Sequence, residues 1–164
     1  MERGALPSLT FRRTMPLMEA SLNKEVDEGN AYFTVRWSPI LKADRHQIIG
    51  SVPAVAGLFE LYYQDKSGGL NLFLLGNAWY GGLRSWIRGA TDPTVETDPG
   101  RRKILNDHPC YYRYCMSNSH PDIQDVLFFL GDTYFAGKNP HQPSGRYENI
   151  FVNEVTPEKL IWRK

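Results

Sequence analysis

Residues 57–88, GLFELYYQDKSGGLNLFLLGNAWYGGLRSWIR, constrain the fold more than any other stretch of the chain. Two apolar runs, 57–64 and 70–76, flank the glycine-containing connection DKSGG, which is typical of a β-hairpin. Helical spacing of apolar residues marks the segment that follows, through Trp79, Leu83, Trp86 and Ile87. The stretch therefore predicts two antiparallel strands followed directly by a helix.

Further strands and helices are expected on either side of this stretch. β-Branched and aromatic residues predict strands over 31–37, 111–117 and 149–155. An apolar interior and a proline near the start predict a helix over 119–135, and a shorter helix is expected over 101–108. Residues 38–55 are predicted to form a loop with one short apolar piece.

The ends of the chain carry weaker signals. Residues 1–30 contain prolines and end in the turn-forming run DEGN. They are predicted to form an N-terminal extension, with a short helix over 16–26. A helical turn is expected over 156–164, with Thr156 as its cap. A chain of 164 residues fits one domain. We therefore expect one α+β domain over 31–164, with a small, mainly antiparallel three-stranded core sheet flanked by helices and an additional C-terminal strand.

Charge and cysteine content narrow the class of protein. A net charge of +1 gives no global attraction to nucleic acid or membrane, so any basic site must be local. Cys110 and Cys115 would lie on opposite faces of a strand and lack the C-x-x-C spacing of zinc sites. Two reduced thiols and no signal peptide or membrane span predict a cytoplasmic protein without a membrane partner.

The order strand, strand, helix, strand, helix after residue 52 resembles the GIY-YIG nuclease domain, including its excision-repair members. The triplet GLF (57–59) stands where the family has GIY, and the residues Leu74, Leu75 and Gly76 stand at YIG. Arg84 follows Gly76 at the spacing of the family's catalytic arginine. The resemblance covers residues 52 to 140 and implies a nuclease fold.

The same resemblance implies that the chemistry is lost. Members of the family hydrolyse a DNA phosphodiester with tyrosine hydroxyls, an arginine and a metal-binding glutamate. Here Phe59 and Leu74 replace the two tyrosines, and Leu130 replaces the glutamate, so only Arg84 remains. Alternation places Phe59 and Leu61 on one face of their strand, and Leu72 and Leu74 on one face of the partner strand. If these faces point to the site, they give a hydrocarbon surface unsuited to hydrated Mg²⁺.

Basic side chains offer a different kind of site. Arg84 and Arg88 are one helical turn apart, so they share a face that could hold phosphate or carboxylate or could simply be solvated. Arg101, Arg102 and Lys103 form a second basic cluster, with the same two interpretations. We assign all five residues to a predicted nucleic-acid-binding surface.

Substitute catalytic groups are scarce in the sequence. Tyr80 is the best-placed substitute hydroxyl, and the nearest carboxylates are Glu60, Asp122, Asp125 and Asp132. Acids in a first helical turn usually favour the helix dipole, so Asp122 and Asp125 are expected to stabilise their helix. His46, His108, His120 and His141 are scattered and predict no metal site, while Tyr111, Tyr112 and Tyr114 are expected to pack along their strand.

Three hypotheses of function follow. The first is a non-catalytic GIY-YIG-like module, without a cofactor, that binds nucleic acid or a protein through the Arg84/Arg88 face. The second is a divergent Mg²⁺-dependent nuclease that uses displaced residues, such as Tyr80 with Asp122 or Asp125. The third is a structural protein that self-associates through an aromatic surface. The sequence fixes neither the partner nor the oligomeric state.

Overall fold

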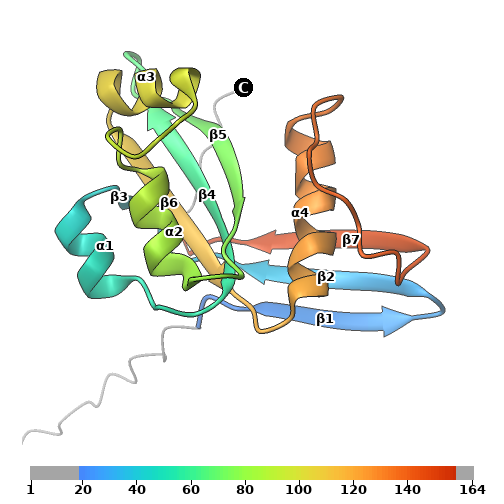
Figure 1. The fold of residues 1–164 in the computed structure, drawn as a ribbon. Helices are drawn as coiled ribbons and strands as arrows, with labels where there is room; N and C mark the ends of the chain where they lie inside the picture. Colours follow the sequence, from blue (N-terminus) through green and yellow to red (C-terminus); the bar gives the residue numbers. More distant parts are fainter. Residues whose placement is uncertain (1–18, 158–164) are drawn as a thin grey trace, which may run out of the picture.

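The computed structural model describes residues 19–157, which fold into two sheets and four helices (Figure 1). The chain is α+β, as expected. Its helices are α1 (Arg45–Ser51), α2 (Gly82–Ala90), α3 (Pro99–Asp107) and α4 (His120–Tyr134). Its strands are β1 (Leu22–Asp27), β2 (Asn30–Arg36), β3 (Leu41–Lys42), β4 (Gly57–Gln64), β5 (Leu70–Asn77), β6 (Cys110–Met116) and β7 (Asn149–Val155). No described helix has the length and apolar character needed to span a bilayer.

The larger sheet has the strand order β3-β6-β4-β5 and is antiparallel throughout. The hairpin of β4 and β5 forms as predicted, and β6 pairs with the other side of β4. The predicted three-stranded sheet is thus confirmed, and the two-residue strand β3 extends it at the β6 edge.

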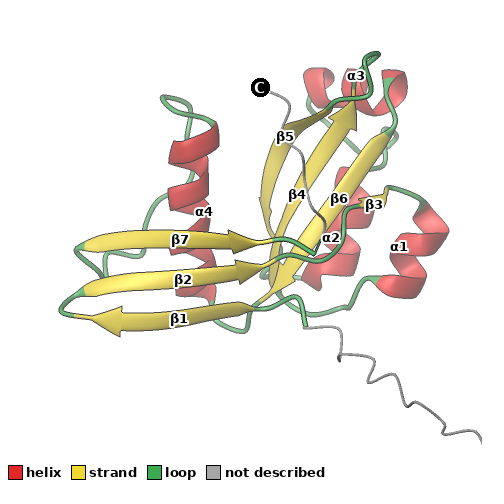
Figure 2. Cartoon of the chain, turned by 180° about the vertical axis from the view of Figure 1, so that it is seen from behind, coloured by secondary structure: helices red, strands yellow, loops and turns green. Residues whose placement is uncertain are grey.

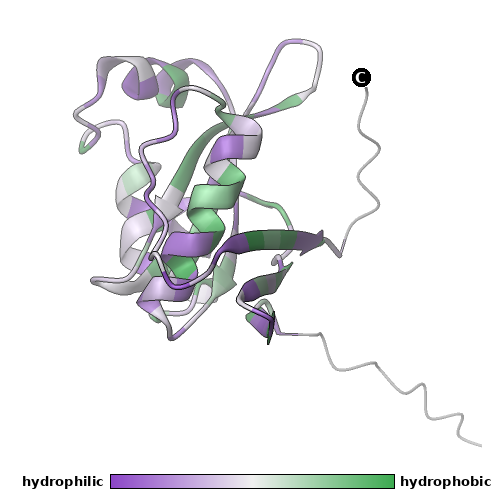
Figure 3. Ribbon diagram, turned by 90° about the vertical axis from the view of Figure 1, so that its right-hand side faces the viewer, coloured by the Kyte–Doolittle hydropathy of each residue, from purple (hydrophilic) through white to green (hydrophobic). Residues whose placement is uncertain are grey.

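A second sheet has the order β1-β2-β7, with β1 antiparallel and β7 parallel to β2. The predicted C-terminal strand therefore exists, but it belongs to this second sheet. Helix α4 covers one face of the sheet, and Figure 2 shows the three strands from their other face. Ala31, Phe33 and Val35 of β2 are buried beneath α4, whose middle turns are its hydrophobic part (Figure 3).

Two expectations for the first half of the chain are wrong. Residues 22–27, assigned to an extension with a helix over 16–26, form strand β1 instead. The predicted loop over 38–55 contains β3 and the helix α1, whose N-cap Asp44 accepts a hydrogen bond from the backbone N–H of Gln47. The helical turn expected over 156–164 lies largely outside the described residues.

Two hydrophobic clusters occupy opposite faces of the larger sheet. Leu58 and Leu75 pack with α4 and the second sheet, whereas Phe59 and Leu61 pack with α1 and α2. The pairing of β4 with β5 shifts between Leu61 and Tyr62, which marks a β-bulge. Because of this shift, Leu72 packs against the first cluster and Leu74 against the second, so the expectation that they share a face is wrong.

We expect Gly76→Ala to destabilise the fold through the cross-strand pair of Gly76 and Phe59. A methyl group at Gly76 would overlap the Phe59 ring, which lies directly on the glycine. Overpacking of this kind costs about 1–3 kcal/mol of unfolding free energy, measurable by urea denaturation. Phe59→Leu should recover part of the loss in the Gly76→Ala background. Equal stability of Gly76→Ala and the wild type would contradict this packing.

Candidate functional site

A cleft of about 530 Å³ lies between α2, the end of β5 and the segment that leads into α3. Its volume is in the range of ligand-binding pockets. Apolar and aromatic side chains supply most of its wall, together with a few polar groups. The lining residues are Phe59, Leu74, Leu75, Gly76, Asn77, Ser85, Trp86, Gly89, Ala90, Val95, Glu96, Thr97 and Arg101.

Aromatic rings define the floor and the rim of this cleft. Phe59 is 1% exposed and forms part of the floor, beside Leu74 of the partner strand. Trp86 is 47% exposed at the rim, and its indole N–H donates a hydrogen bond to the carbonyl of Tyr80. Val95, which also lines the cleft, is 61% exposed. The cleft therefore offers an apolar surface that is open to solvent.

An ion pair closes the polar end of the cleft. Nε and Nη2 of Arg101 each donate to a carboxylate oxygen of Glu96 at 3.1 Å, and the Asp98 backbone N–H donates to the same carboxylate at 2.8 Å. The hydrogen bonds from Arg101 hold the pKa of Glu96 below its usual value. Glu96 is thus an ionised, almost fully buried partner of Arg101, a bidentate arrangement of high geometric specificity.

The predicted basic cluster is largely used within the chain. Besides Arg101, Arg102 donates two hydrogen bonds to the backbone carbonyl of Glu96, at 3.0 and 2.7 Å. Lys103 pairs with Asp107 one helical turn along α3, at 2.6 Å. These contacts hold the start of α3 and offset part of the positive charge that the sequence places at 101–103.

Arg84 and Arg88 lie on a different side of α2 from the cleft. Nε of Arg84 donates to the carbonyl of Val52, the C-cap of α1, at 2.8 Å. This bond to a backbone acceptor uses one nitrogen of the guanidinium, and Arg84 is half-buried. Arg88 is exposed one turn later. Neither arginine lines the cleft, whose α2 residues are Ser85, Trp86, Gly89 and Ala90.

The residues predicted to mark the former site do not all come together. Phe59 and Leu74 share the cleft, as expected for neighbouring strands. Leu130 is buried in the cluster under α4, on the opposite face of the sheet from Phe59. A carboxylate at Leu130 would therefore face the other side of the sheet, and hydrocarbon at both places does not suit Mg²⁺. Tyr80 is 79% exposed beside the rim residue Trp86.

Glu60, noted in the sequence only as a nearby carboxylate, belongs to a buried network. It lies directly opposite Arg113 across β4 and β6, and Nε of Arg113 donates to its Oε2 at 2.5 Å. Tyr62 donates to the same oxygen. Nη2 of Arg113 continues to Oε1 of Glu154 on β7 at 3.3 Å, and Trp37 and Tyr134 also donate to Glu154. The network thus connects the two sheets and α4.

Burial dominates the electrostatics of this network. Glu60 is 0% and Arg113 2% exposed, and the guanidinium carbon lies 4.4 Å from the centre of the Trp37 ring. Loss of solvent raises the pKa of Glu60, although Arg113 and Tyr62 stabilise the carboxylate. Glu60 Oε1 and Arg113 Nη1 have no hydrogen-bond partner within the structure. The network is structural, because it joins the larger sheet to β7 and its residues do not line the cleft.

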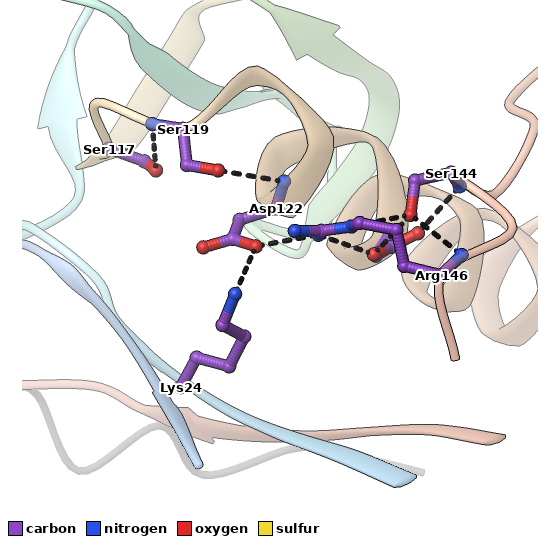
Figure 4. A network of polar contacts seen from close by, with 7 residues as sticks. Lys24, Ser117, Ser119, Asp122, Ser144 and Arg146 are labelled. Atoms are coloured by element: carbon purple, nitrogen blue, oxygen red, sulfur yellow. Dashed lines mark hydrogen bonds and ion pairs between the residues drawn. The ribbon is translucent and has the colours of Figure 1, made fainter. Parts of the chain in front are cut away.

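A second polar network anchors the start of α4 (Figure 4). Asp122 accepts from Lys24 of β1 at 2.9 Å and from Arg146 at 2.7 Å. Asp125, fully buried, accepts from Arg146 and from both the backbone N–H and the hydroxyl of Ser144. These carboxylates hold the 135–148 segment and β1 against α4, which the sequence did not reveal because both partners are distant along the chain.

The remaining candidates are separate from the cleft. Asp132 accepts from Asn139, and both cysteines are buried free thiols whose pKa values burial raises, to about 11 for Cys110 and about 12 for Cys115. The ring of His120 packs on Trp79, and that of His108 on Tyr63. Within residues 19–157, no three His, Cys, Asp or Glu residues gather as a possible metal-binding set.

Comparison with known proteins gives a family but no activity. A family model described as "Uncharacterised protein" matches residues 21–164. The chain belongs to that family. Its matched region begins just before β1, and so includes the strand that the sequence analysis assigned to an extension. No curated protein and no solved structure matches the chain.

The Asp122 network predicts a pH-dependent contribution to stability. Partial burial raises the pKa of Asp122, but hydrogen bonds from Arg146 and Lys24 outweigh it and lower the pKa below the ordinary value of 3.8. The folded state therefore favours the ionised form, and this contribution is present above pH 3.8 and is lost as the pH falls through the lower folded pKa.

We expect Asp122→Asn to cost about 1–3 kcal/mol of unfolding free energy at pH 7, with a smaller difference from the wild type below pH 3.8. Urea titrations across this range measure the difference. Glu28→Gln, at an exposed turn position, serves as the control. A difference that stays constant down to acid pH would show that the charge of Asp122 is not what the network uses.

Proposed function

We propose that this protein is a non-catalytic binding module whose binding element is α2 with its adjacent cleft. The cleft takes an apolar side chain of the partner, and Trp86 forms its aromatic rim, with the exposed Tyr80 next to it. At protein interfaces, the residues that contribute most of the binding energy typically lie in buried, well-packed pockets surrounded by a polar rim. An open apolar cleft without a partner would leave Trp86 and Val95 in water.

The nature of the cleft floor carries this proposal. If the chain is a GIY-YIG-like domain, Phe59 and Leu74 occupy the places of the two catalytic tyrosines. In this protein both residues line the cleft, and neither can donate or accept a proton. The positions that carry the catalytic tyrosines in that family would then form an apolar contact surface in this protein.

The Arg84/Arg88 face remains part of the proposed binding surface. It adjoins the cleft along α2, so one partner could contact both sides of the helix. This surface is compatible with either a protein or a nucleic acid as its partner, because a guanidinium group binds carboxylate and phosphate alike. The pairing of Arg101, Arg102 and Lys103 within the chain leaves less positive charge for nucleic acid than the sequence indicates.

A divergent nuclease is the second proposal from the sequence. It would use Tyr80 together with Asp122 or Asp125. Both carboxylates already accept hydrogen bonds from Arg146, so they would have to exchange this partner for a metal ion. Cleavage of labelled DNA with Mg²⁺ or Mn²⁺, abolished by Asp125→Asn but not by Glu28→Gln, would favour the nuclease over the binding module.

Filling the cleft should abolish binding of a small apolar probe. N-acetyl-tryptophan amide, added to the protein in an NMR titration, should shift the backbone amides of Leu74–Asn77 and of Ser85 and Gly89. Gly89→Leu should remove these shifts, because a side chain at Gly89 meets open space at the cleft wall and occupies it without a clash.

Gly50→Leu provides the matched control for this variant. Gly50 lies in α1, and a side chain there also meets open space, so both changes add the same group to a helix. The control should bind the probe as the wild type does. Equal binding by wild type, Gly50→Leu and Gly89→Leu would show that the probe does not use the cleft, and the proposed function would fail.

A further inference from the structure

The charge around α2 indicates what kind of partner the cleft serves. Helix α2 carries Arg84 and Arg88 and contains no acidic residue. The neighbouring helix α1, which packs beside α2 (Figure 1), adds the exposed residue Arg45, with Lys42 just before it. The α1–α2 surface is therefore a local basic patch in a chain that is otherwise nearly neutral.

Two carboxylates reduce the positive charge of this patch but do not neutralise it. Asp44 is engaged as the N-cap of α1. Asp92 accepts hydrogen bonds from the backbone N–H and the hydroxyl of Thr94. Those bonds are the main reason that the pKa of Asp92 is lowered, and the positive charges of Arg45 and Arg88 lower it further. The packing of α1 against α2 brings the two arginine-bearing helices side by side. The patch thus carries four cations, Lys42, Arg45, Arg84 and Arg88, and two acids, each of which already accepts hydrogen bonds through its Oδ1.

The basic patch and the cleft lie within reach of one peptide. Arg84 and Arg88 each precede a residue of the cleft wall, Ser85 and Gly89, by one position, which is about 100° around the helix. An extended peptide covers roughly 7–10 Å in two or three residues, enough to pass over a helix surface from one side to the other. A side chain anchored beside Trp86 would place its near neighbours over Arg88.

We propose that the partner is a protein segment with an apolar anchor residue flanked by acidic residues. This inference rests on the proposed function and names the partner of the same site. The apolar cleft selects an aromatic or aliphatic side chain, and Arg88 with Arg45 selects carboxylates beside it. A nucleic acid would gain less, because the arginine and lysine side chains at 101–103, which would extend the basic surface along its phosphates, are bonded within the chain.

Three peptides of one length test this inference. All have a central tryptophan between serines, and their outer positions are either Asp-Asp, Asn-Asn or Lys-Lys on both sides. Isothermal titration at low salt should give the Asp peptide an affinity about five- to tenfold above the Asn peptide, the sum of two or three exposed ion pairs. The Lys peptide should bind more weakly than the Asn peptide, and high salt should reduce both differences.

Two variants test whether Arg88 causes the preference for the Asp peptide. Arg88→Gln should reduce the advantage of the Asp peptide at least threefold while leaving the Asn peptide unchanged. Lys138→Gln, an exposed lysine in the segment after α4, should change neither affinity. Gly89→Leu should weaken binding of all three peptides, because it fills the cleft.

The outcomes separate the two proposals. Equal affinity for the three peptides, with loss of binding in Gly89→Leu, would overturn the acidic partner and leave the binding module intact. Tighter binding of the Lys peptide, or of a thymidine oligonucleotide than of the Asp peptide, would also overturn it. Binding of none of these probes would overturn the inference and the proposed function together.

Discussion

Arg113 is the residue on which the arrangement of the two sheets depends. A guanidinium that is 2% exposed must be paired, because removing an unpaired charge from water costs several kcal/mol by order of magnitude. Glu60 on β4 and Glu154 on β7 supply the two carboxylates. The first contact fixes the register of β4 against β6, and the second requires β7 to lie beside the larger sheet with Glu154 turned inward.

This requirement gives the two faces of the larger sheet different surroundings. The face of the larger sheet that carries Glu60 and Arg113 is covered by α4 and the second sheet, and it is stabilised by charge. The opposite face carries Phe59 and Leu74 and is only partly covered by α1 and α2, which leaves the cleft. Because neighbouring residues of β4 point to opposite faces, Phe59 and Glu60 belong to different sides. The buried ionic network and the open cleft therefore lie on opposite faces of the larger sheet.

Local signals predict much of this fold. The hairpin of β4 and β5 and the helices α2, α3 and α4 follow from periodicity, glycine and proline positions. Strand β1 was missed because it is exposed along almost its whole length and so shows no apolar alternation. A signal was nevertheless present, because Glu28 and Gly29, with φ of 46° and 80°, form the tight turn of a hairpin. Helix α1 was missed because it is short, although Asp44 and Gln47 have the spacing of a helix cap.

Contacts between segments that are distant along the chain could not be predicted from such local signals. The pairing of Glu60 with Arg113 depends on strand register, and the separation of Leu72 from Leu74 depends on a bulge. The sequence identified Phe59 and Leu74 as neighbours but omitted Trp86 and Glu96, which complete the cleft. Arg84 was assigned from its spacing alone, and its bond to Val52 depends on how α1 packs against α2.

Hydrogen exchange in an Arg113→Met variant tests most directly whether the buried network joins the two sheets. If it does, the amides of β2 and β7 in the variant should exchange roughly 150- to 5,000-fold faster than in the wild type, since breaking a buried ion pair costs about 3–5 kcal/mol. Unchanged protection of β7 in the variant would contradict the account, because the second sheet would then be held by its apolar contacts alone.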